Sequence, residues 1–385
     1  MKWYESYLKS FKYDVTYVDF NHKPPSFEYV FDPIDKNIID NLSQYTLLEN
    51  PSFLLTKADY AEYRKKTKHF IFNNFYMWSK RRLDILPDVK SQDQLNRRNL
   101  PTDIKIPTHP KVRKVDSLHV NEAVQYVEQH FSKNHGTSDS FSFPISHHDA
   151  AKWLTHWITR KFASFGDYQD AIRDDTSFLF HSVLSSSINI GLLLPTDIIQ
   201  TITKIKHTIP LNSYEGYVRQ LFWREYQRYC YIYFNFNRKN YFNYKNKLTD
   251  DWYTATLGIQ PVDDCIHKGF STGYLNHIER LMIVGNFMSL KGISPRQGFR
   301  WFMEMSCDSY EWVMAQNVYD MVFFVSGGVT MRRPYVSSSN YVVKMSNYKK
   351  NSWCIAWDEL FLQFKKKHKQ KLWKFRYFFR GLHLC

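Results

Sequence analysis

The stretch FHSVLSSSINIGL, residues 180–192, is the most informative part of this sequence. Three small hydroxyl residues, among them Ser185, precede Ile188, and Ser182 lies shortly before them. Gly191 follows, and a residue without a side chain lets the backbone approach a ligand or a neighbouring helix closely. Serine hydroxyls and free backbone N–H groups at the start of a helix form a site for anions. Taken alone, such a run is more often a helix cap than a phosphate site.

The pattern around this stretch is helical over most of the chain. Gly (13) and Pro (14) are scarce among the 385 residues, which argues against a turn-rich all-β architecture. Apolar residues recur at intervals of three to four positions, as on one face of a helix, in seven segments: 119–132, 147–163, 195–206, 213–235, 272–291, 295–314 and 357–380. We therefore expect a mostly α-helical fold.

The first hundred residues carry a different pattern. Residues 1–12 predict an amphipathic helix, DVTYVDF (14–20) predicts a strand, and 57–82 predicts a helix that mixes aromatic and charged residues. This order gives one α-then-β step without the strand and loop that usually open an α/β sheet. Residues 88–110 are polar and lack an apolar period, which indicates a linker or an exposed crossover.

The charge of the chain favours a polyanionic partner. There are 52 Lys and Arg against 37 Asp and Glu, for a formal charge of +15. Such a surplus is typical of nucleic-acid binding, because basic residues near phosphates release condensed counterions. A basic host proteome or a solubilising surface is the alternative, and a membrane surface ranks third. The basic face KKKHKQKLWKFR (365–376) is either a solvated helix surface or an edge that contacts phosphates.

Cysteine usage and the N-terminus bear on the compartment. The five cysteines form no Cys-x-x-Cys pair, and an odd, scattered number suits a reducing compartment. The N-terminus MKWYESYLKS has no apolar signal region, and no run approaches the roughly 18 apolar residues that span a bilayer. These features predict a soluble, intracellular protein.

Further segments occur in a characteristic order along the chain: FGDYQDAI (165–172), EGYVRQLFWREY (215–226), NHIERLMIVGNF (276–287), SYEWVMAQN (309–317) and RRPYVSSSNYVVKMSNY (332–348). Together with 180–192 they resemble the cryptochrome and photolyase superfamily, in particular the deoxyribodipyrimidine photolyase-related branch of iron–sulfur bacterial cryptochromes and photolyases. Characterised members of that branch repair (6-4) photoproducts. The resemblance runs from residue 1 to about residue 380.

The resemblance implies a domain organisation. It predicts a truncated α/β antenna-like domain over residues 1–95, a linker over 96–118, and an all-helical FAD-binding domain over 119–385. The antenna-like part lacks the first strand and loop of the family, which normally help to hold a lumazine antenna, so binding of that antenna is doubtful. The shortened sheet exposes an edge. Either the gene is split or decayed, or a separately encoded N-terminal fragment supplies the missing piece.

The resemblance also implies residues that bind FAD. Ser182 and Ser185 match the residues that bind the FAD phosphates. Arg280 matches the arginine over the isoalloxazine ring, and Asp308 matches its carboxylate partner. A buried pair of this kind is costly unless each member fills a defined role.

A second group of cofactor residues follows from the same comparison. Gln220 and Arg224 lie in the segment that resembles the flavin-flanking helix, with a plain helix-surface hydrogen bond as the alternative. That helix is one residue shorter than in the branch. Met314 stands at the position facing the flavin N5 atom, which is acidic in this branch. A thioether cannot exchange a proton with N5 as a carboxyl group can.

The residues implied in repair are a histidine and several aromatics. His277 matches the histidine that protonates the (6-4) photoproduct as the electron arrives, and imidazole suits this task because its usual pKa is close to working pH. Tyr335 matches a tyrosine lining the lesion pocket. Trp301 matches the tryptophan of the electron-transfer chain, and Tyr341 a further relay residue. The second histidine that the family has just before His277 is Asn276 here.

The cysteines depart from the branch. Cys265 and Cys354 match the first and last ligands of its four-cysteine iron–sulfur cluster, but the middle pair is replaced by Lys349 and Ser352. Two thiolates cannot provide this ligation, so we predict no iron–sulfur cluster and no metal. The function expected is light-driven repair of UV-damaged DNA, most specifically of (6-4) photoproducts, by electron transfer from reduced FAD. The alternatives are an FAD-binding cryptochrome-like photoreceptor and an inactive, decayed relative.

Overall fold

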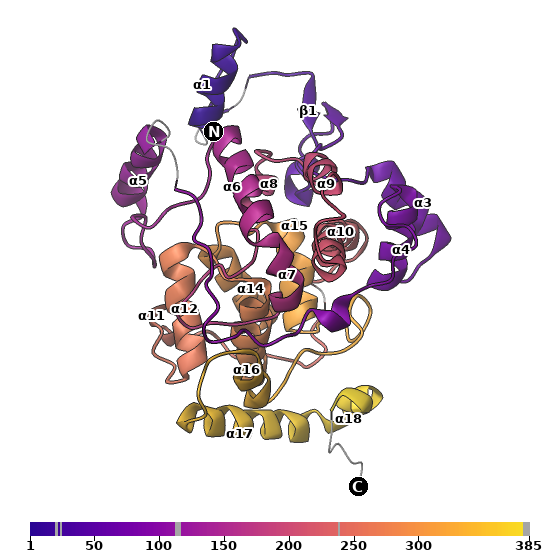
Figure 1. Ribbon diagram of the computed structural model, residues 1–385, viewed down its shortest axis with the longest axis vertical. Coiled ribbons are helices and arrows are strands. Elements are labelled where there is room, and N and C mark those ends of the chain that lie inside the picture. The colour runs from indigo at the N-terminus through magenta and orange to yellow at the C-terminus, as the bar shows by residue number, and fades with distance from the viewer. Residues whose placement is uncertain (20–21, 24, 112–116, 238, 380–385) are drawn as a thin grey trace.

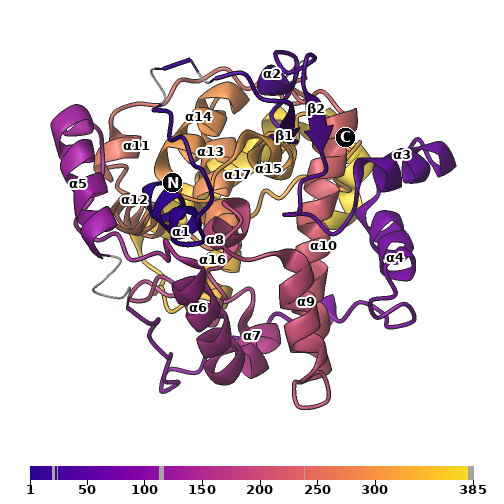
Figure 2. The same ribbon diagram turned by 90° about the horizontal axis from the view of Figure 1, so that it is seen from above.

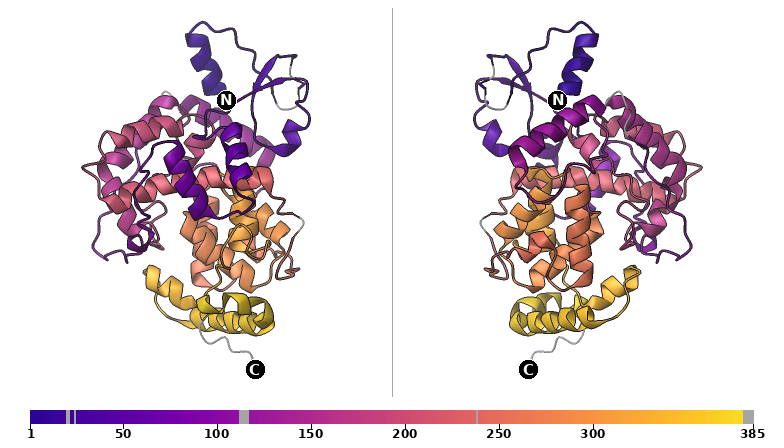
Figure 3. Two further views of the ribbon diagram at one scale, coloured as in Figure 1. Left: turned by 90° about the vertical axis from the view of Figure 1, so that its right-hand side faces the viewer. Right: turned by 90° about the vertical axis from the view of Figure 1, so that its left-hand side faces the viewer.

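The computed structural model describes residues 1–19, 22–23, 25–111, 117–237 and 239–379. Within these ranges the chain is mostly α-helical, with one two-stranded sheet near the N-terminus, so the expected fold class is confirmed (Figure 1). The N-terminal sheet and the first helix lie at one end of the molecule, and the last helices lie across the opposite end (Figure 3). None of the helices in the described ranges is long and apolar enough to cross a membrane.

The N-terminal part contains a small α/β unit at an unexpected place. Its elements are α1 (Lys2–Ser10), β1 (Tyr29–Phe31), α2 (Lys36–Ile39) and β2 (Thr46–Leu48). The two strands are parallel, with Tyr29 opposite Thr46, and α2 forms part of the crossover that parallel strands need. The strand predicted at 14–20 is wrong for residues 14–19, which form none, and Phe20 lies outside the described residues. An extended segment becomes a strand only where a neighbour pairs with it, and the pairing here joins residues 29–31 to 46–48.

The helix predicted at 57–82 is two helices, α3 (Lys57–Lys66) and α4 (Phe72–Arg82). A capping box between Thr56 and Asp59 begins α3, and the extended backbone of Thr67 ends it. The break lets both helices direct aromatic rings at the same neighbour: the Tyr63 and Phe75 rings lie 5.2 Å apart, and each contacts Tyr229. Packing therefore determines the break.

The long helix α10 (Leu211–Tyr233) organises the body of the protein. It packs against α4, α7 (Phe162–Tyr168) and α15 (Glu311–Met314), and Figure 2 shows it running past α9 (Pro195–Thr203). Gly166 is required where α7 meets α10, because a Cβ there would lie 2.4 Å from the backbone nitrogen of Ser213. The Ser213 hydroxyl accepts the Gly166 N–H at 2.8 Å, which fixes the contact.

The helices predicted at 272–291 and 295–314 are interrupted. Helix α12 (Gln260–Thr272) ends at Gly273, whose φ of +64° suits glycine. A π-helical segment, η3 (Glu279–Gly285), then leads into α13 (Asn286–Leu290). Helix α14 (Pro295–Met305) is followed by α15 and by a second π-helical segment, η4 (Ala315–Val322). The intervening turns at 273–278 and 306–310 carry side chains of the candidate site.

The remaining elements complete the body and its C-terminal end. They are η1 (Asp93–Leu95), α5 (Ser117–Phe131), α6 (His147–Arg160), α8 (Ser185–Asn189), α11 (Asp251–Thr254), α16 (Ser339–Met345), α17 (Ser352–Lys367), α18 (Lys369–Leu372) and η5 (Trp373–Phe378). The helix predicted at 357–380 thus begins earlier, because Asn351 caps α17, and breaks at His368. Of the predicted linker 96–118, residues 112–116 lie outside the described residues and Ser117 already begins α5. The domain boundaries stay a prediction.

Candidate functional site

A carboxylate, a guanidinium and two hydroxyls meet at the centre of the helical body. Asp308, in the turn after α14, accepts from Arg280 Nη2 at 2.8 Å and from the hydroxyl of Ser185 at 2.6 Å. Ser306 donates to the same carboxylate at 2.5 Å. Burial alone would raise the pKa of Asp308, but Arg280 and the two hydroxyls outweigh burial and hold that pKa below its usual value. The Arg280–Asp308 salt bridge expected from the sequence is confirmed.

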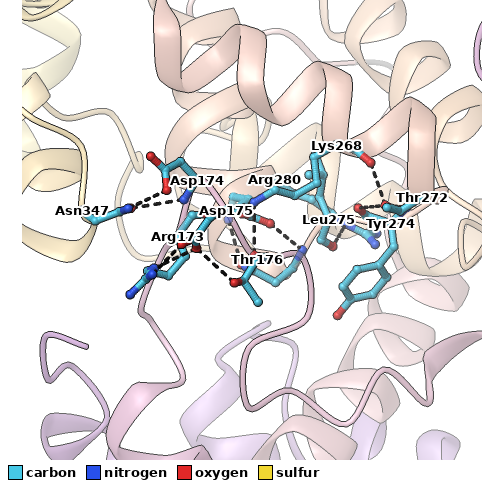
Figure 4. A network of polar contacts seen from close by, with 12 residues as sticks. Arg173, Asp174, Asp175, Thr176, Lys268, Thr272, Tyr274, Leu275, Arg280 and Asn347 are labelled. Atoms are coloured by element: carbon cyan, nitrogen blue, oxygen red, sulfur yellow. Dashed lines mark hydrogen bonds and ion pairs between the residues drawn. The ribbon is translucent and has the colours of Figure 1, made fainter. Parts of the chain in front are cut away.

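Arg280 is oriented from two sides. Its Nε donates to the backbone carbonyl of Leu275 at 2.7 Å, and its guanidinium lies 5.4 Å from the centre of the Tyr274 ring (Figure 4). Nη1 makes no hydrogen bond to any residue that the structure describes. Burial would lower the pKa of Arg280, yet the charge of Asp308 raises it. The result is a fixed cation with one free donor group.

The network continues to α10 through a residue that the sequence reasoning missed. Asn189 donates to the Asp308 carbonyl at 3.0 Å and accepts from Arg224 Nη2 at 3.3 Å. The sequence could have indicated this role, because Asn189 lies one helical turn after Ser185 on the same face of α8. Arg224 also donates to the Ser52 carbonyl, and burial lowers its pKa to about 10. Gln220, one turn earlier on α10, is half-buried and makes no hydrogen bond within the described ranges.

The serine run is only partly joined to this network. Ser182 lies beside the hydroxyl of Tyr217 on α10 rather than beside Asp308. The single donor of Ser185 is used on Asp308, so Ser185 cannot also donate to a phosphate while that bond lasts. The hydroxyls of Ser186 and Ser187 are buried and have no partner among the described residues. Polar groups of this kind fit an oxygen-rich ligand such as a diphosphate.

His277 lies one turn before Arg280. Its side chain is exposed, yet its pKa is lowered to about 4. The largest cause is the loss of hydration next to surrounding protein atoms, and the positive charges of Arg280 and His181 add to it. At neutral pH the imidazole is therefore uncharged.

The aromatic candidates lie apart from His277. Tyr335 is half-buried with the Arg333 guanidinium 5.1 Å from its ring centre, and it lies beside Tyr341, whose pKa burial raises. No contact joins Tyr335 to His277 in the part of the chain that the structure describes. Trp301 is fully buried and donates from Nε1 to the carbonyl of Trp252 at 2.8 Å.

Met314 and the two matched cysteines are buried as well. Met314 ends α15 inside the main hydrophobic core. Cys265 lies near Tyr348, whose ring centre is 6.4 Å from that of Trp353, the neighbour of Cys354. Burial raises the pKa of Cys265 well above its usual value, which keeps the thiol protonated. No group of three or more metal-ligating side chains occurs within the described ranges.

A buried ion pair holds the segment that carries His277 and Arg280 in place. Lys268 on α12 donates to Glu279 at 2.7 Å. It also donates to the carbonyl of Arg173 at 2.7 Å (Figure 4). Glu279 in turn accepts from the backbone N–H of Asn276 at 3.2 Å. Asn276, which replaces the family's second histidine, thus helps to form the turn that begins the π-helical segment.

The chain is similar to proteins of the photolyase-related family of the photolyase and cryptochrome superfamily. Residues 29–143 match the family described as deoxyribodipyrimidine photo-lyase-related protein. The chain is 32% identical over 317 residues to a (6-4) photolyase of Agrobacterium fabrum, a match that covers 79% of this chain and 62% of that protein. The chain thus spans about three fifths of the length of this relative.

Two of the further similarities are as follows. An uncharacterised protein of Acanthamoeba polyphaga mimivirus is 52% identical over 84 residues, which is 22% of this chain and 68% of that protein. The crystal structure of a bacterial class III photolyase from Agrobacterium tumefaciens superposes with a TM-score of 0.49 at 17% identity, over 80% of this chain and 64% of that one.

Proposed function

We propose that this protein is a photolyase-like flavoprotein that binds FAD and repairs UV photoproducts in DNA under light, with (6-4) photoproducts as its substrate. The observation that carries the proposal is the ionised Asp308 held between Arg280 and Ser185. The similarity to a (6-4) photolyase supports the substrate class.

The residues of the network fit a flavin with a diphosphate. Arg280 would offer its free Nη1 to the flavin ring, and Asp308 keeps the guanidinium in place. Ser182, Ser186 and Ser187 would serve the diphosphate together with Ser185, once Ser185 releases Asp308. Arg224, whose Nε is buried without a partner, and Gln220 would flank the cofactor from α10. When bound and reduced, FAD supplies the light-excited electron for repair.

His277 would hold the proton that the lesion takes up. Its pKa of about 4 keeps it neutral at pH 7 in the free protein. Phosphate charges of bound DNA would raise that pKa, because a nearby anion favours imidazolium. Substrate binding would then create the acid where it is needed. Tyr335 would line the lesion pocket, and Trp301 and Tyr341 would relay electrons to the flavin.

A photoreceptor without repair activity is the second candidate. It is favoured by Met314 at the position expected to face the flavin N5 atom, since a thioether cannot exchange a proton there. The neutral state of His277 favours it as well.

One experiment separates these functions. Purified protein is mixed with FAD, its visible absorption spectrum is recorded, and it is then illuminated with blue light in the presence of DNA that carries (6-4) photoproducts. We expect bound flavin absorption, and repair only in the light. Bound flavin without repair would favour the photoreceptor, and protein that stays colourless would indicate a decayed relative.

Damaged DNA and a second polypeptide are the proposed partners. The charge of +15 supports the first. For the second, we propose a fragment with a β-strand that pairs with the small N-terminal sheet. Parallel sheets are normally covered on both faces, yet Tyr29 and Phe31 in β1 are 54% and 58% exposed. Leu47 and Leu48 in β2 are exposed too.

A further inference from the structure

Lys161 is a buried cation without a counter-ion. It directly follows α6 and is 1% exposed. Its Nζ donates to the Leu179 carbonyl at 2.8 Å and to Nε2 of His109 at 2.9 Å. No carboxylate pairs with it among the residues that the structure describes. Burial lowers its pKa to about 8, so the ammonium is still charged at neutral pH. An unpaired buried charge is costly, and natural sequences retain one mainly where it has a role.

Three histidines surround this lysine, and each has a ring nitrogen that is buried without a partner: His109 Nδ1, His156 Nε2 and His181 Nδ1. The His109 and His156 rings lie 6.3 Å apart, and His181 binds the Gln169 carbonyl through Nε2 at 3.0 Å. Because Lys161 donates to Nε2 of His109, the proton of this neutral ring is on Nδ1. Nδ1 of His109 is thus a donor without an acceptor.

The charges that act on the three histidines from the described part of the chain are positive. Burial is the largest cause that lowers the pKa of each of the three histidines, and the charge of Lys161 lowers it further. Arg160 also lowers the pKa of His156. Within the described ranges, no carboxylate acts on Lys161 or on the three histidines. His109 is held in place between the rings of Trp153 and Phe178, at 4.7 and 5.1 Å. These ring contacts hold the His109 imidazole beside Lys161.

We propose that Lys161, His109, His156 and His181 form a binding site for an oxyanion of the phosphate class. The anion accepts from the remaining N–H of Lys161 and from Nδ1–H of His109. Its charge also favours protonation of His156 and His181, whose free nitrogens then become donors. Binding is consequently tighter at lower pH. Free phosphate, a DNA backbone phosphate and a nucleotide phosphate share this chemistry.

The proposed phosphate site is adjacent in sequence to the candidate flavin site, but the two sites use different side chains. His181 directly precedes Ser182, and its charge state acts on His277. The side chains of His181 and Ser182 diverge, however, toward the Gln169 carbonyl and toward Tyr217. A phosphate bound at Lys161 would thus change the charge state of His181, which in turn acts on His277.

The test is thermal unfolding of the full chain with inorganic phosphate at constant ionic strength. We expect phosphate to raise Tm of the wild type, and more so at pH 6 than at pH 8. Lys161→Met should weaken the apparent affinity for phosphate about tenfold or more, since it removes a charged donor. Lys161→Arg should retain the effect. Lys152→Met, at an exposed lysine on α6, is the matched control and should behave as wild type.

Two further arms identify the source of the phosphate. If Lys161→Met lowers the salt dependence of single-stranded DNA binding by about 0.7 per decade, the ligand is a backbone phosphate. If it lowers FAD content instead, the ligand is a nucleotide phosphate, and if neither changes, the ligand is a small oxyanion. Equal stabilisation of wild type and Lys161→Met by phosphate, or none at all, would overturn the proposal. These measurements of phosphate binding need neither flavin nor light, so they are independent of the proposed repair activity.

If the Lys161→Met variant does not fold, a second measurement on the wild type still tests the site. Ring nitrogen chemical shifts of His109 and His181 in the wild type should move on addition of phosphate. Shifts that stay unchanged would contradict the site even without a variant.

Discussion

Asp308 shows how a single residue position supports the flavin proposal. Its carboxylate joins three side chains that come from three separate segments of the chain. The resemblance identified Arg280 and Asp308 as a pair, and the structure confirms their contact. It could not reveal that Ser185 is engaged by the same carboxylate, since that depends on how α8 packs against the turn after α14.

Asp308→Asn should destabilise the protein strongly. The change leaves the Arg280 guanidinium, whose side chain is 15% exposed, without a counter-charge. For this we expect a loss of about 3 kcal/mol in the free energy of unfolding. Chemical denaturation measures this. The matched control is Glu304→Gln, which removes the exposed partner of Arg300 and should cost about 0.5 kcal/mol or less. Equal effects of the two changes would show that Asp308 is not an essential partner of Arg280.

His277 should change its charge state when DNA binds. Its pKa is about 4 in the free protein, so the protonated fraction falls about tenfold for each pH unit above that value. We expect NMR titration of the free protein to give a value well below 6.5, and DNA with a (6-4) photoproduct to raise it. A value near 6.5 in the free protein would contradict the influence of Arg280 and His181.

Replacement of His277 tests its role in repair. His277→Ala should lower the rate of light-driven repair by about 10² to 10⁴, the usual contribution of a positioned acid, and leave FAD bound. His267→Ala, at an exposed histidine on α12, serves as control. Repair by His277→Ala at the wild-type rate would assign the proton to another group even if the flavin proposal holds.

At the scale of elements, periodicity located the helices but not their interruptions. The predicted helices at 57–82, 272–291 and 295–314 are each divided. The glycine at 273 is a local signal that could have been used for the second of these helices. The π-helical segments have no such signal, because they arise where packing against η4 and α12 sets the position of η3. The strand expected at 14–20 shows the same limit, since pairing depends on partners that a local pattern does not identify.

The joint between α17 and α18 makes the protein sensitive to acid. His368 is 7% exposed among the rings of Phe242 and Phe364, and burial together with Lys367 and Lys371 lowers its pKa to about 4. The unfolded chain binds a proton near pH 6.5 and the folded one only near 4. The neutral ring therefore contributes its full stability above pH 6.5, and loses it as pH falls toward 4.

His368→Gln removes this titration. The wild type should be the more stable form at pH 7.5, because the imidazole packs against three aromatic rings. The difference in the free energy of unfolding between the two proteins should shrink as pH falls from 6.5 to 4. A difference that stays constant over this interval would show that His368 is not held neutral.

For the whole molecule, the two ends differ in how well they are supported. The basic C-terminal end is anchored to the body: Lys371 and Lys374 donate to the carbonyls of Tyr241 and Gly327 at 2.5 and 2.6 Å. These two lysines of the basic segment 365–376 therefore hold the C-terminal helices to the body, in addition to any contact with solvent or phosphates. The N-terminal end consists of α1 and a two-stranded sheet that stand out from the body (Figure 3).

The N-terminal sheet should open far more readily than the body. Two strands alone are marginally stable, and those at 29–31 and 46–48 leave Tyr29 and Phe31 largely exposed. Helix α10, by contrast, buries Tyr226 and Tyr229 completely. Hydrogen exchange should therefore give little protection of the strand amides and strong protection of those at 226–230, with free energies of opening that differ by several kcal/mol. A fragment that adds a strand, as proposed above, should raise the protection of the sheet and leave α10 unchanged. Protection that rises with the concentration of the chain alone would mean that a second copy covers the sheet, and sheet amides as protected as α10 in dilute protein would contradict the need for any partner there.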